Sequence, residues 1–243
     1  MSRKVHAILG DIHGNREALE AVLEDAASRG ATHYVSVGDI VGYNADPVFC
    51  LDKVRELCAA CVRGNHDHYC SHDESLEDFH PLAANVVDWT RSSLTEAQRR
   101  FLRDLPLIRQ IEGYTIVHST LDMPEKWGYV FDSLDADANF SYQMTVVCFH
   151  GHTHIPVVYE RGPRTRRRSF SKIDVEVGRK YFVNVGSVGQ PRDGDIRAAY
   201  VLFDLQNRTM ELCRAKYDVA KTQAKIRKAN LPERLAKRLE LGQ

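Results

Sequence analysis

The sequence predicts an α/β fold in a single domain, and two features of the chain support that prediction. In its first third, short apolar runs are followed three times by a polar turn and then by residues with helical periodicity. This strand–turn–helix order is typical of a parallel sheet covered by helices. Beyond residue 107, apolar runs of strand length dominate, which predicts a second half rich in strands.

The first junction is Val5–Asn15, in which an apolar run breaks at Gly10 and is followed at once by Asp11 and His13. The run predicts a short buried strand, and Asn15 is placed to cap an amphipathic helix. A carboxylate and an imidazole therefore lie where a strand ends, the edge at which open α/β sheets bind ligands. Alone, this junction indicates little, because an Asp in such a turn is often only a helix cap.

The same arrangement recurs along the chain, at Gly38-Asp39 and at Arg63–Asp67. The elements predicted for the first half are strands at 33–37 and 60–62, a helix at 47–57, and two helices within 76–104, the second beginning at Thr95. The elements predicted for the second half are a hairpin of 107–111 and 114–117, a helix near 135–142, strands at 145–149, 157–160, 169–177, 181–185, 198–203 and 210–214, and a polar helical tail from about 219.

Charge and composition exclude several classes of function. The chain has 243 residues, of which 43% are hydrophobic, enough for a sizeable core. Its 33 basic and 33 acidic side chains cancel, and no basic stripe interleaved with aromatic residues is present, which disfavours a nucleic-acid partner. No apolar run approaches the roughly 20 residues of a membrane span. We therefore expect a cytoplasmic protein with reduced cysteines and no membrane partner.

The polar residues that follow predicted strands are all of metal-ligating types. They are Asp11, His13, Asp39, Asn65, His66, His118, His152 and His154. Oxygen and nitrogen ligands without a thiolate suit Mn²⁺, Fe, Co²⁺, Ni²⁺ or Zn²⁺ better than Ca²⁺ or Mg²⁺. The set is too large for one ion and suits two, which Asp39 as a bridging carboxylate would hold roughly 3.5–4 Å apart. A single member could be a cap or a packed histidine, but five such motifs directly after strands indicate a site.

The order of these motifs resembles that of the calcineurin-like metallophosphoesterase superfamily. The motifs are Asp11-x-His13, Gly38-Asp39, Gly64-Asn65-His66-Asp67, His118 and Gly151-His152-x-His154. In addition, residues 39–43 (DIVGY), 89–91 (WTR) and 184–192 (NVGSVGQPR) are similar to a bacterial subgroup of small single-domain members. The resemblance implies a four-layer α/β/β/α sandwich of two mixed sheets, formed by residues 1–243 as one domain.

The resemblance also implies a role for each motif residue. Carried over by position, one metal is held by Asp11, His13 and His154, the other by Asn65, His118 and His152, and Asp39 bridges the two. His66 matches the family's general acid, and Asp67 matches the residue that orients it. Ser119 departs from the pattern, because many relatives have Gly or Ala after the histidine of the fourth motif.

The implied function is the hydrolysis of phosphate mono- or diesters with two divalent transition-metal ions, Mn²⁺ before Fe, Ni, Co or Zn. In such a mechanism a metal-bridging hydroxide attacks in line while the ions neutralise the phosphoryl oxygens. An imidazole near neutral pH can then protonate the leaving alkoxide, and no protein nucleophile is needed. The expected substrate is a small phosphoester or a nucleotide-type molecule.

Three basic features of the chain bear on substrate binding. Arg63 is either a surface arginine or a bidentate clamp on the substrate phosphate, as in the similar Arg-Gly-Asn-His of protein phosphatases, and we favour the clamp. Arg192, in a Pro-Arg-Asp-Gly turn, is a second candidate for substrate binding. The run Arg161–Arg168 is expected on a solvated hairpin tip, with a groove for a polyanionic substrate as the alternative.

A non-catalytic protein-binding scaffold on the same fold is the competing function, because the similar retromer subunit uses this fold for protein contacts. His66 discriminates between the two, since scaffold members lose the catalytic histidine and this chain retains it with every ligand. Monoester and diester substrates both remain compatible with these residues.

Overall fold

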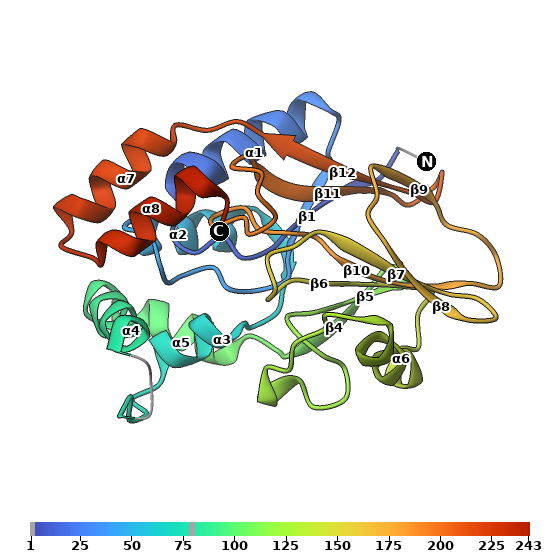
Figure 1. Cartoon of the computed structure of the whole chain (residues 1–243), viewed down its shortest axis with the longest axis horizontal. Coiled ribbons are helices and arrows are strands. Elements are labelled where there is room, and N and C mark those ends of the chain that lie inside the picture. The colour runs from blue at the N-terminus through green and yellow to red at the C-terminus, as the bar shows by residue number, and fades with distance from the viewer. Residues whose placement is uncertain (1–2, 78–80) are drawn as a thin grey trace.

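The computed structural model describes residues 3–77 and 81–243, in which two six-stranded sheets lie face to face between helices (Figure 1). The first sheet contains, in spatial order, β3 (Cys58–Cys61), β2 (His33–Ser36), β1 (Val5–Leu9), β11 (Ala198–Asp204), β12 (Thr209–Ala215) and β9 (Lys172–Asp174). The second contains β4 (Ile108–Ile111), β5 (Tyr114–Val117), β6 (Val147–His150), β10 (Lys180–Asn184), β7 (Val157–Arg161) and β8 (Thr165–Arg168).

Helices lie on the outer side of both sheets. The helices of the described residues are α1 (Arg16–Ser28), α2 (Pro47–Leu57), α3 (Asn65–Ser71), α4 (Pro81–Ser93), α5 (Glu96–Asp104), α6 (Ser133–Tyr142), α7 (Val219–Lys228) and α8 (Glu233–Leu241), with a short 3₁₀ helix at Pro124–Lys126. Residues of α1 and α2 pack on the outer face of the first sheet, and α6 packs on the second. Helices α7 and α8 lie side by side, α7 against α1 (Figure 1). The expected four-layer sandwich is thereby confirmed.

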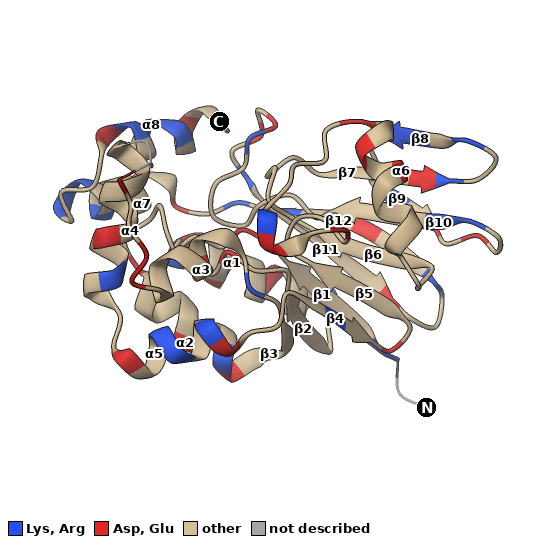
Figure 2. Ribbon diagram, turned by 90° about the horizontal axis from the view of Figure 1, so that it is seen from below, with Lys and Arg blue, Asp and Glu red and all other residues tan. Residues whose placement is uncertain are grey.

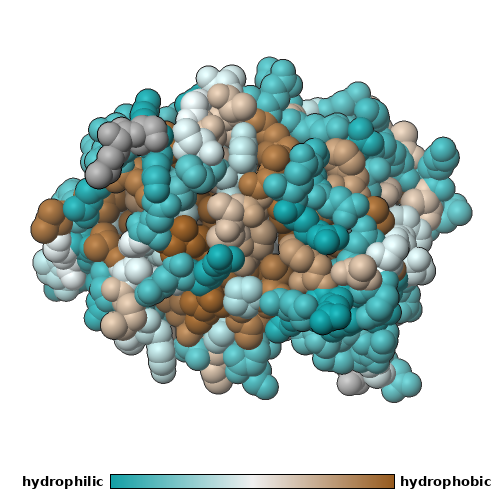
Figure 3. Space-filling model, turned by 180° about the vertical axis from the view of Figure 1, so that it is seen from behind, coloured by the Kyte–Doolittle hydropathy of each residue, from teal (hydrophilic) through white to brown (hydrophobic). Residues whose placement is uncertain are grey.

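The core between the sheets explains why four of the five residues of β1 are apolar, His6 being the exception. Ile8 of β1 packs between the sheets with Phe149 of β6, whereas its neighbours Ala7 and Leu9 face the outer helices. A strand that is buried on both faces is typically apolar along most of its length. Hydrophilic residues cover much of the face seen in Figure 3, although apolar residues reach the surface toward its middle. No helix in the described ranges is both long and apolar enough to cross a lipid bilayer.

Strand direction brings the predicted motifs to one edge. Strands β1, β2 and β3 are parallel to one another, and so are β5, β6 and β10. The carboxyl ends of parallel strands meet at the same edge of a sheet, where ligands bind in open α/β folds. In this fold the turns that follow β1, β2, β3, β5 and β6 therefore come together from both sheets.

Two predictions about the elements are wrong in detail. The helix expected from residue 76 begins at Pro81 instead; Leu76 and Glu77 are not helical, and residues 78–80 lie outside the described residues. Of the strand expected at 169–177, only Lys172–Asp174 forms a strand, β9, which pairs with β12 in the first sheet, whereas the preceding β8 pairs with β7 in the second. The tail is helical from Val219, as expected, and consists of two helices, the second of which begins just after Pro232.

The basic run Arg161–Arg168 forms a hairpin, as expected, but most of it is strand rather than loop tip. Strand β8 is the outer strand of the second sheet, and its arginines are exposed (Figure 2). Arg168 forms an ion pair with Glu160 at 2.8 Å across the hairpin. Charged side chains on an outer strand hinder pairing with a second sheet, so the run has a structural explanation in this fold.

Candidate metal centre

The site is built from five turns, each of which follows a strand. Asp11 and His13 follow β1, Asp39 follows β2, Asn65 and His66 open α3 after β3, His118 follows β5, and His152 and His154 follow β6. Asn65 is half-buried and the other seven side chains are buried. The structure therefore brings together all the residues predicted as ligands. Three groups of side chains in the described chain lie close enough to share an ion, and all three are here.

The backbone at the site is unusual. Asp11, His13, Asp39, His152 and His154 all have left-handed φ angles, between 47° and 71°. Such conformations cost on the order of 1–3 kcal/mol for residues other than glycine and persist where the surrounding structure enforces them. Two glycines contribute to this constraint. A Cβ atom on Gly64 would collide with Oδ1 of Asp39, and one on Gly151 would collide with Oδ2 of Asp11.

Each predicted histidine ligand is held by a backbone carbonyl on the side away from the cluster. The N–H···O=C pairs are His13 Nδ1 with Val41 (3.0 Å), His118 Nδ1 with Val37 (3.0 Å), His152 Nε2 with Trp127 (3.0 Å) and His154 Nδ1 with Gln190 (2.6 Å). Because a carbonyl accepts only, the outer nitrogen must carry the proton, which leaves the inner nitrogen free to bind a metal.

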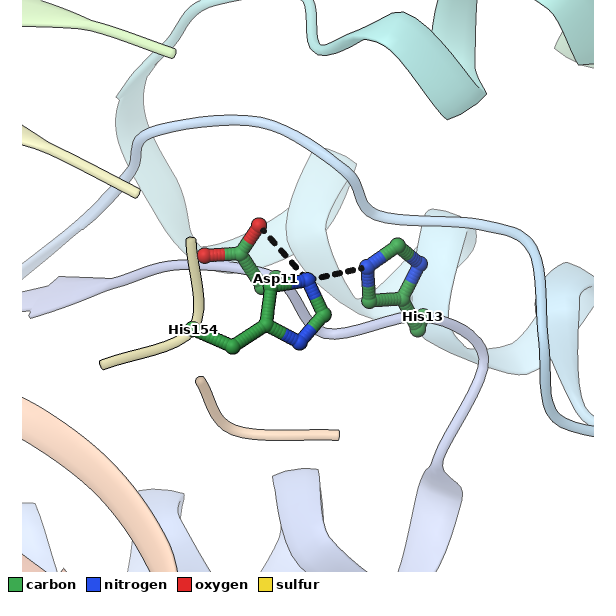
Figure 4. A group of neighbouring side chains, drawn as sticks. All are labelled: Asp11, His13 and His154. Carbon is green, nitrogen blue, oxygen red and sulfur yellow. Dashed lines mark hydrogen bonds and ion pairs between the residues drawn. The ribbon is translucent and has the colours of Figure 1, made fainter. Parts of the chain in front are cut away.

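The inner nitrogens form two groups. In the first, Nε2 of His154 lies 3.1 Å from Nε2 of His13 and 3.4 Å from Oδ1 of Asp11 (Figure 4). In the second, Nε2 of His118 lies 3.1 Å from Nδ1 of His152 and 3.0 Å from Oδ1 of Asn65. Asp39 Oδ2 lies between the groups, 3.6 Å from His13 Nε2 and 3.4 Å from His118 Nε2.

This arrangement fits two cations. Unprotonated nitrogens and carboxylate oxygens at these distances face one another with lone pairs only, so that their mutual repulsion favours a positive ion between them. Nitrogen and oxygen donors without sulfur suit divalent transition metals. Each group has three donor side chains of its own, and Asp39 lies close to both groups.

The electrostatics agree with ligation by neutral imidazole at His13, His152 and His154. Burial lowers the pKa values of His13 and His154 well below the usual range, and that of His152 to about 3. Burial would also raise the pKa of Asp39, but His118 and other neighbouring histidines hold it well below its usual range. Conversely, burial would lower the pKa of His118, yet Asp39 raises it to about 9. At His118 a proton and a metal ion therefore compete for Nε2.

His66 lies beside the first group, which is formed by Asp11, His13 and His154. Its ring is 4.7 Å from that of His13, and its backbone N–H donates to Oδ1 of Asp39 at 2.8 Å. Its Nδ1 has no hydrogen-bond partner among the described residues. The carboxylate of Asp67 accepts from the backbone N–H groups of Ile40 (2.8 Å) and Gly64 (3.1 Å) rather than from the His66 ring. Asp67 thus ties the turn of His66 to the turn of Asp39.

The two predicted substrate-binding arginines lie in different surroundings. Arg63 donates from Nη1 to the carbonyl of Arg103 at 2.7 Å, and burial lowers the pKa of its guanidinium. The backbone N–H of Arg192 donates to the carbonyl of the predicted ligand His154 at 3.3 Å. Its guanidinium lies 5.7 Å from the ring centre of Tyr43.

Three aromatic residues at the site were not among the residues predicted from the sequence. The Tyr43 ring lies 4.4 Å from the rings of both His13 and His66. Trp127 supplies the carbonyl that holds His152, and Tyr129 stacks on His152 at 4.2 Å. Tyr43 lies within residues 39–43, whose similarity to the bacterial subgroup could have pointed to it. Trp127 could not be found in this way, because a residue of any type can supply a backbone carbonyl that orients a histidine.

Comparison with known proteins gives a consistent result. The sequence profile of the calcineurin-like phosphoesterase superfamily domain matches residues 5–208. An uncharacterized protein of Methanocaldococcus jannaschii is 40% identical over 247 residues, covering 100% of both chains. The crystal structure of a metallophosphoesterase from Sphaerobacter thermophilus is 36% identical with a TM-score of 0.89, covering 100% of both chains. A hypothetical protein from Pyrococcus horikoshii shares the fold, with 19% identity, a TM-score of 0.78 and coverage of 100% and 99%.

Proposed function

The chain belongs to the calcineurin-like phosphoesterase superfamily, and on that premise we propose that it hydrolyses phosphate mono- or diesters with two divalent metal ions. The observation that carries the proposal is the pair of ligand groups that share Asp39. Asp11, His13 and His154 would hold one ion, and Asn65, His118 and His152 the other. We favour Mn²⁺, with Fe, Ni, Co and Zn as alternatives that the same donors accept.

When bound, two such ions lower the pKa of a water between them toward neutrality and neutralise the phosphoryl oxygens of the substrate. The protein's contribution is to hold their ligands in place. The four backbone carbonyls fix the tautomer and the orientation of the histidines, and Asp67 fixes the turns of Asp39 and His66 relative to each other. Phosphoryl transfer requires chiefly such positioning and charge stabilisation.

His66 is the proposed general acid. Its side chain is the least deeply buried of the site histidines, at 8% exposed, and lies beside the ligand group that contains His13. A proton from this imidazole would be transferred to the alkoxide that leaves the phosphorus, because an alkoxide is too basic to leave unprotonated near neutral pH. A non-catalytic scaffold would have no use for this histidine.

The surroundings support a nucleotide-type or aryl substrate. Tyr129 stacks on His152, and Phe131 stacks on Tyr129 at 5.3 Å with nearly parallel rings. The two side chains are 52% and 59% exposed, so that a flat apolar surface leads outward from a proposed metal ligand. Such rings accept nucleobases and aryl groups by stacking. Arg192 and Arg63 are the candidates for contact with the phosphate.

The test is an activity panel on protein loaded with Mn²⁺. Nitrophenyl phosphate mono- and diesters, cyclic nucleotides and dinucleoside polyphosphates are compared for the wild-type chain, for Asp39→Asn, and for Asp104→Asn at an exposed position. We expect turnover of at least one ester class, its loss in Asp39→Asn, and wild-type rates in Asp104→Asn. A wild-type protein that binds two ions and hydrolyses none of these esters would contradict the proposal.

A further inference from the structure

The C-terminal helices α7 and α8 lie beyond residues 5–208, which the family profile matches, yet α8 packs close to the metal centre. Leu235 and Leu239 of α8 belong to an apolar cluster against which Tyr43 packs. Tyr43 in turn contacts the rings of His13 and His66. Helix α8 therefore supports the position of Tyr43 beside the proposed metal ligand His13.

The end of α8 is also tied to the loop that carries Arg192. The backbone N–H of Gly194 donates to the carbonyl of Gly242 at 3.0 Å, just after α8 ends. The contact is close, because a Cβ atom on Gly242 would lie 2.8 Å from the carbonyl carbon of Gly194. One turn earlier in the helix, α8 carries the half-buried Arg238.

Neither Arg238 nor Arg192 forms an ion pair with a carboxylate of the described chain. The described side-chain contacts of Arg192 are with Gln190 at 3.0 Å and with the Tyr43 ring. Burial and the nearby charge of Arg192 lower the pKa of Arg238. The surrounding loop does contain acidic residues, but these pair elsewhere: Asp195 binds Arg197, and Arg214 binds Asp193.

Arg192 lies two residues before Gly194 and Arg238 four residues before Gly242, so the hydrogen bond between these glycines brings both arginines to the same end of α8. Two cationic side chains there without a paired carboxylate favour a bound oxyanion. We propose that Arg192, which lies over the Tyr43 ring, and Arg238 form a second anion-binding subsite beside the metal centre. The preferred substrates would then be phosphoesters that carry a second phosphate group. This inference rests on the proposed function only in placing the reacting phosphate on the metal ions.

The experiment compares two ligands that differ by one phosphate, propyl phosphate and propane-1,3-diyl bisphosphate. Their dissociation constants are measured by calorimetry on the metal-loaded full-length protein, and KM is measured alongside. The variants are Arg238→Gln, Arg238→Lys and the control Lys237→Gln, which removes the same charge from the adjacent, exposed position of α8. A charge-assisted contact to phosphate contributes about a tenfold factor in affinity.

We expect the wild-type protein to bind the bisphosphate at least tenfold more tightly than propyl phosphate. Arg238→Gln should remove most of that preference, Arg238→Lys should restore part of it, and Lys237→Gln should retain it. If Arg238→Gln left the ratio of the two dissociation constants unchanged, whether or not both ligands bound more weakly, the proposed subsite would be wrong. Binding needs no turnover, so a protein that shows this preference but hydrolyses no ester would contradict the proposed function and leave the subsite standing.

Discussion

Gly42 lies directly against His66: a Cβ atom on Gly42 would be 2.5 Å from Nδ1 of the His66 ring. The ring also contacts the rings of His13, at 4.7 Å, and Tyr43, at 4.4 Å. Any side chain at residue 42 would therefore push the proposed general acid out of its position, while the ligand turns at Asp11 and His118 lie elsewhere.

The first prediction is that Gly42→Ala lowers kcat by at least tenfold while both metal ions stay bound. The matched control is Gly113→Ala, because both glycines have φ of +94° and nothing lies within 4 Å of a Cβ at residue 113. The two variants share the backbone strain and differ in the clash with His66. Equal kcat values for the two variants would show that the ring position does not matter.

The second prediction concerns the identity of the acid. His66→Asn should retain the metal ions and lower kcat by roughly 10²–10⁴-fold, the usual range for the loss of a general acid. The loss should be smaller for nitrophenyl esters than for alkyl esters, because nitrophenolate leaves without protonation. The measurement is a series of esters with leaving groups of increasing pKa. A loss independent of the leaving group would assign His66 another role.

The third prediction is a dependence of stability on pH that arises outside the site. His6 is buried, its Nδ1 lies 2.7 Å from the Tyr114 hydroxyl, and burial lowers its pKa from 6.5 to about 4. Between these values the unfolded chain binds a proton that the folded chain does not. The free energy of unfolding should thus fall by up to about 3 kcal/mol as the pH drops from 6.5 toward 4.

Denaturant unfolding at a series of pH values checks this prediction. In His6→Gln, which can still form a hydrogen bond with Tyr114, the contribution between pH 6.5 and 4 should be missing, although other groups still titrate. Parallel curves for the wild type and the variant across this range would show that His6 does not contribute.

The fourth prediction is that the exposed arginines of β8 limit self-association and do not contribute to catalysis. Changing the exposed Arg166 and Arg167 to serine should leave kcat/KM for small phosphoesters unchanged at low and high salt, because exposed charges are screened beyond about 8–10 Å. It should instead increase self-association, seen by light scattering, because an outer strand without charge can pair with another sheet. A double change of Arg55 and Arg100 on helices to serine controls for net charge. Loss of activity in the β8 variant would mean that the hairpin reaches the site.

Much of the architecture could be predicted from local pattern. The apolar residues Val5, Ala7, Ile8 and Leu9 predicted a short buried strand, and Thr95 predicted the start of α5, which it caps by accepting a hydrogen bond from the backbone N–H of Gln98. The short β9 and the β8 strand before it could not be predicted, because the chain leaves the second sheet after β8 and enters the first at β9.

The candidate site, too, has a part that the sequence predicted and a part that it could not. The residue types of the ligands and their positions after strands predicted which side chains would meet, because parallel strands end at one edge. What the sequence could not provide is the set of backbone contacts around them, such as the carbonyls of Trp127 and Gln190 that hold two histidines. Arg238 was missed for a different reason, since it is more than 80 residues from His154 and reaches the site through packing of the tail.

The central claim is that Asp39 bridges two metal ions, and anomalous diffraction from crystals grown with Mn²⁺ tests it most directly. We predict two peaks roughly 3.5–4 Å apart. One should lie within bonding distance of Asp11, His13 and His154, the other of Asn65, His118 and His152, and both of Asp39. Metal analysis of the same protein should approach two ions per chain, and Asp39→Asn should lose both more readily than His13→Ala. A fully active protein with a single ion, or with two ions that Asp39 does not touch, would contradict the account.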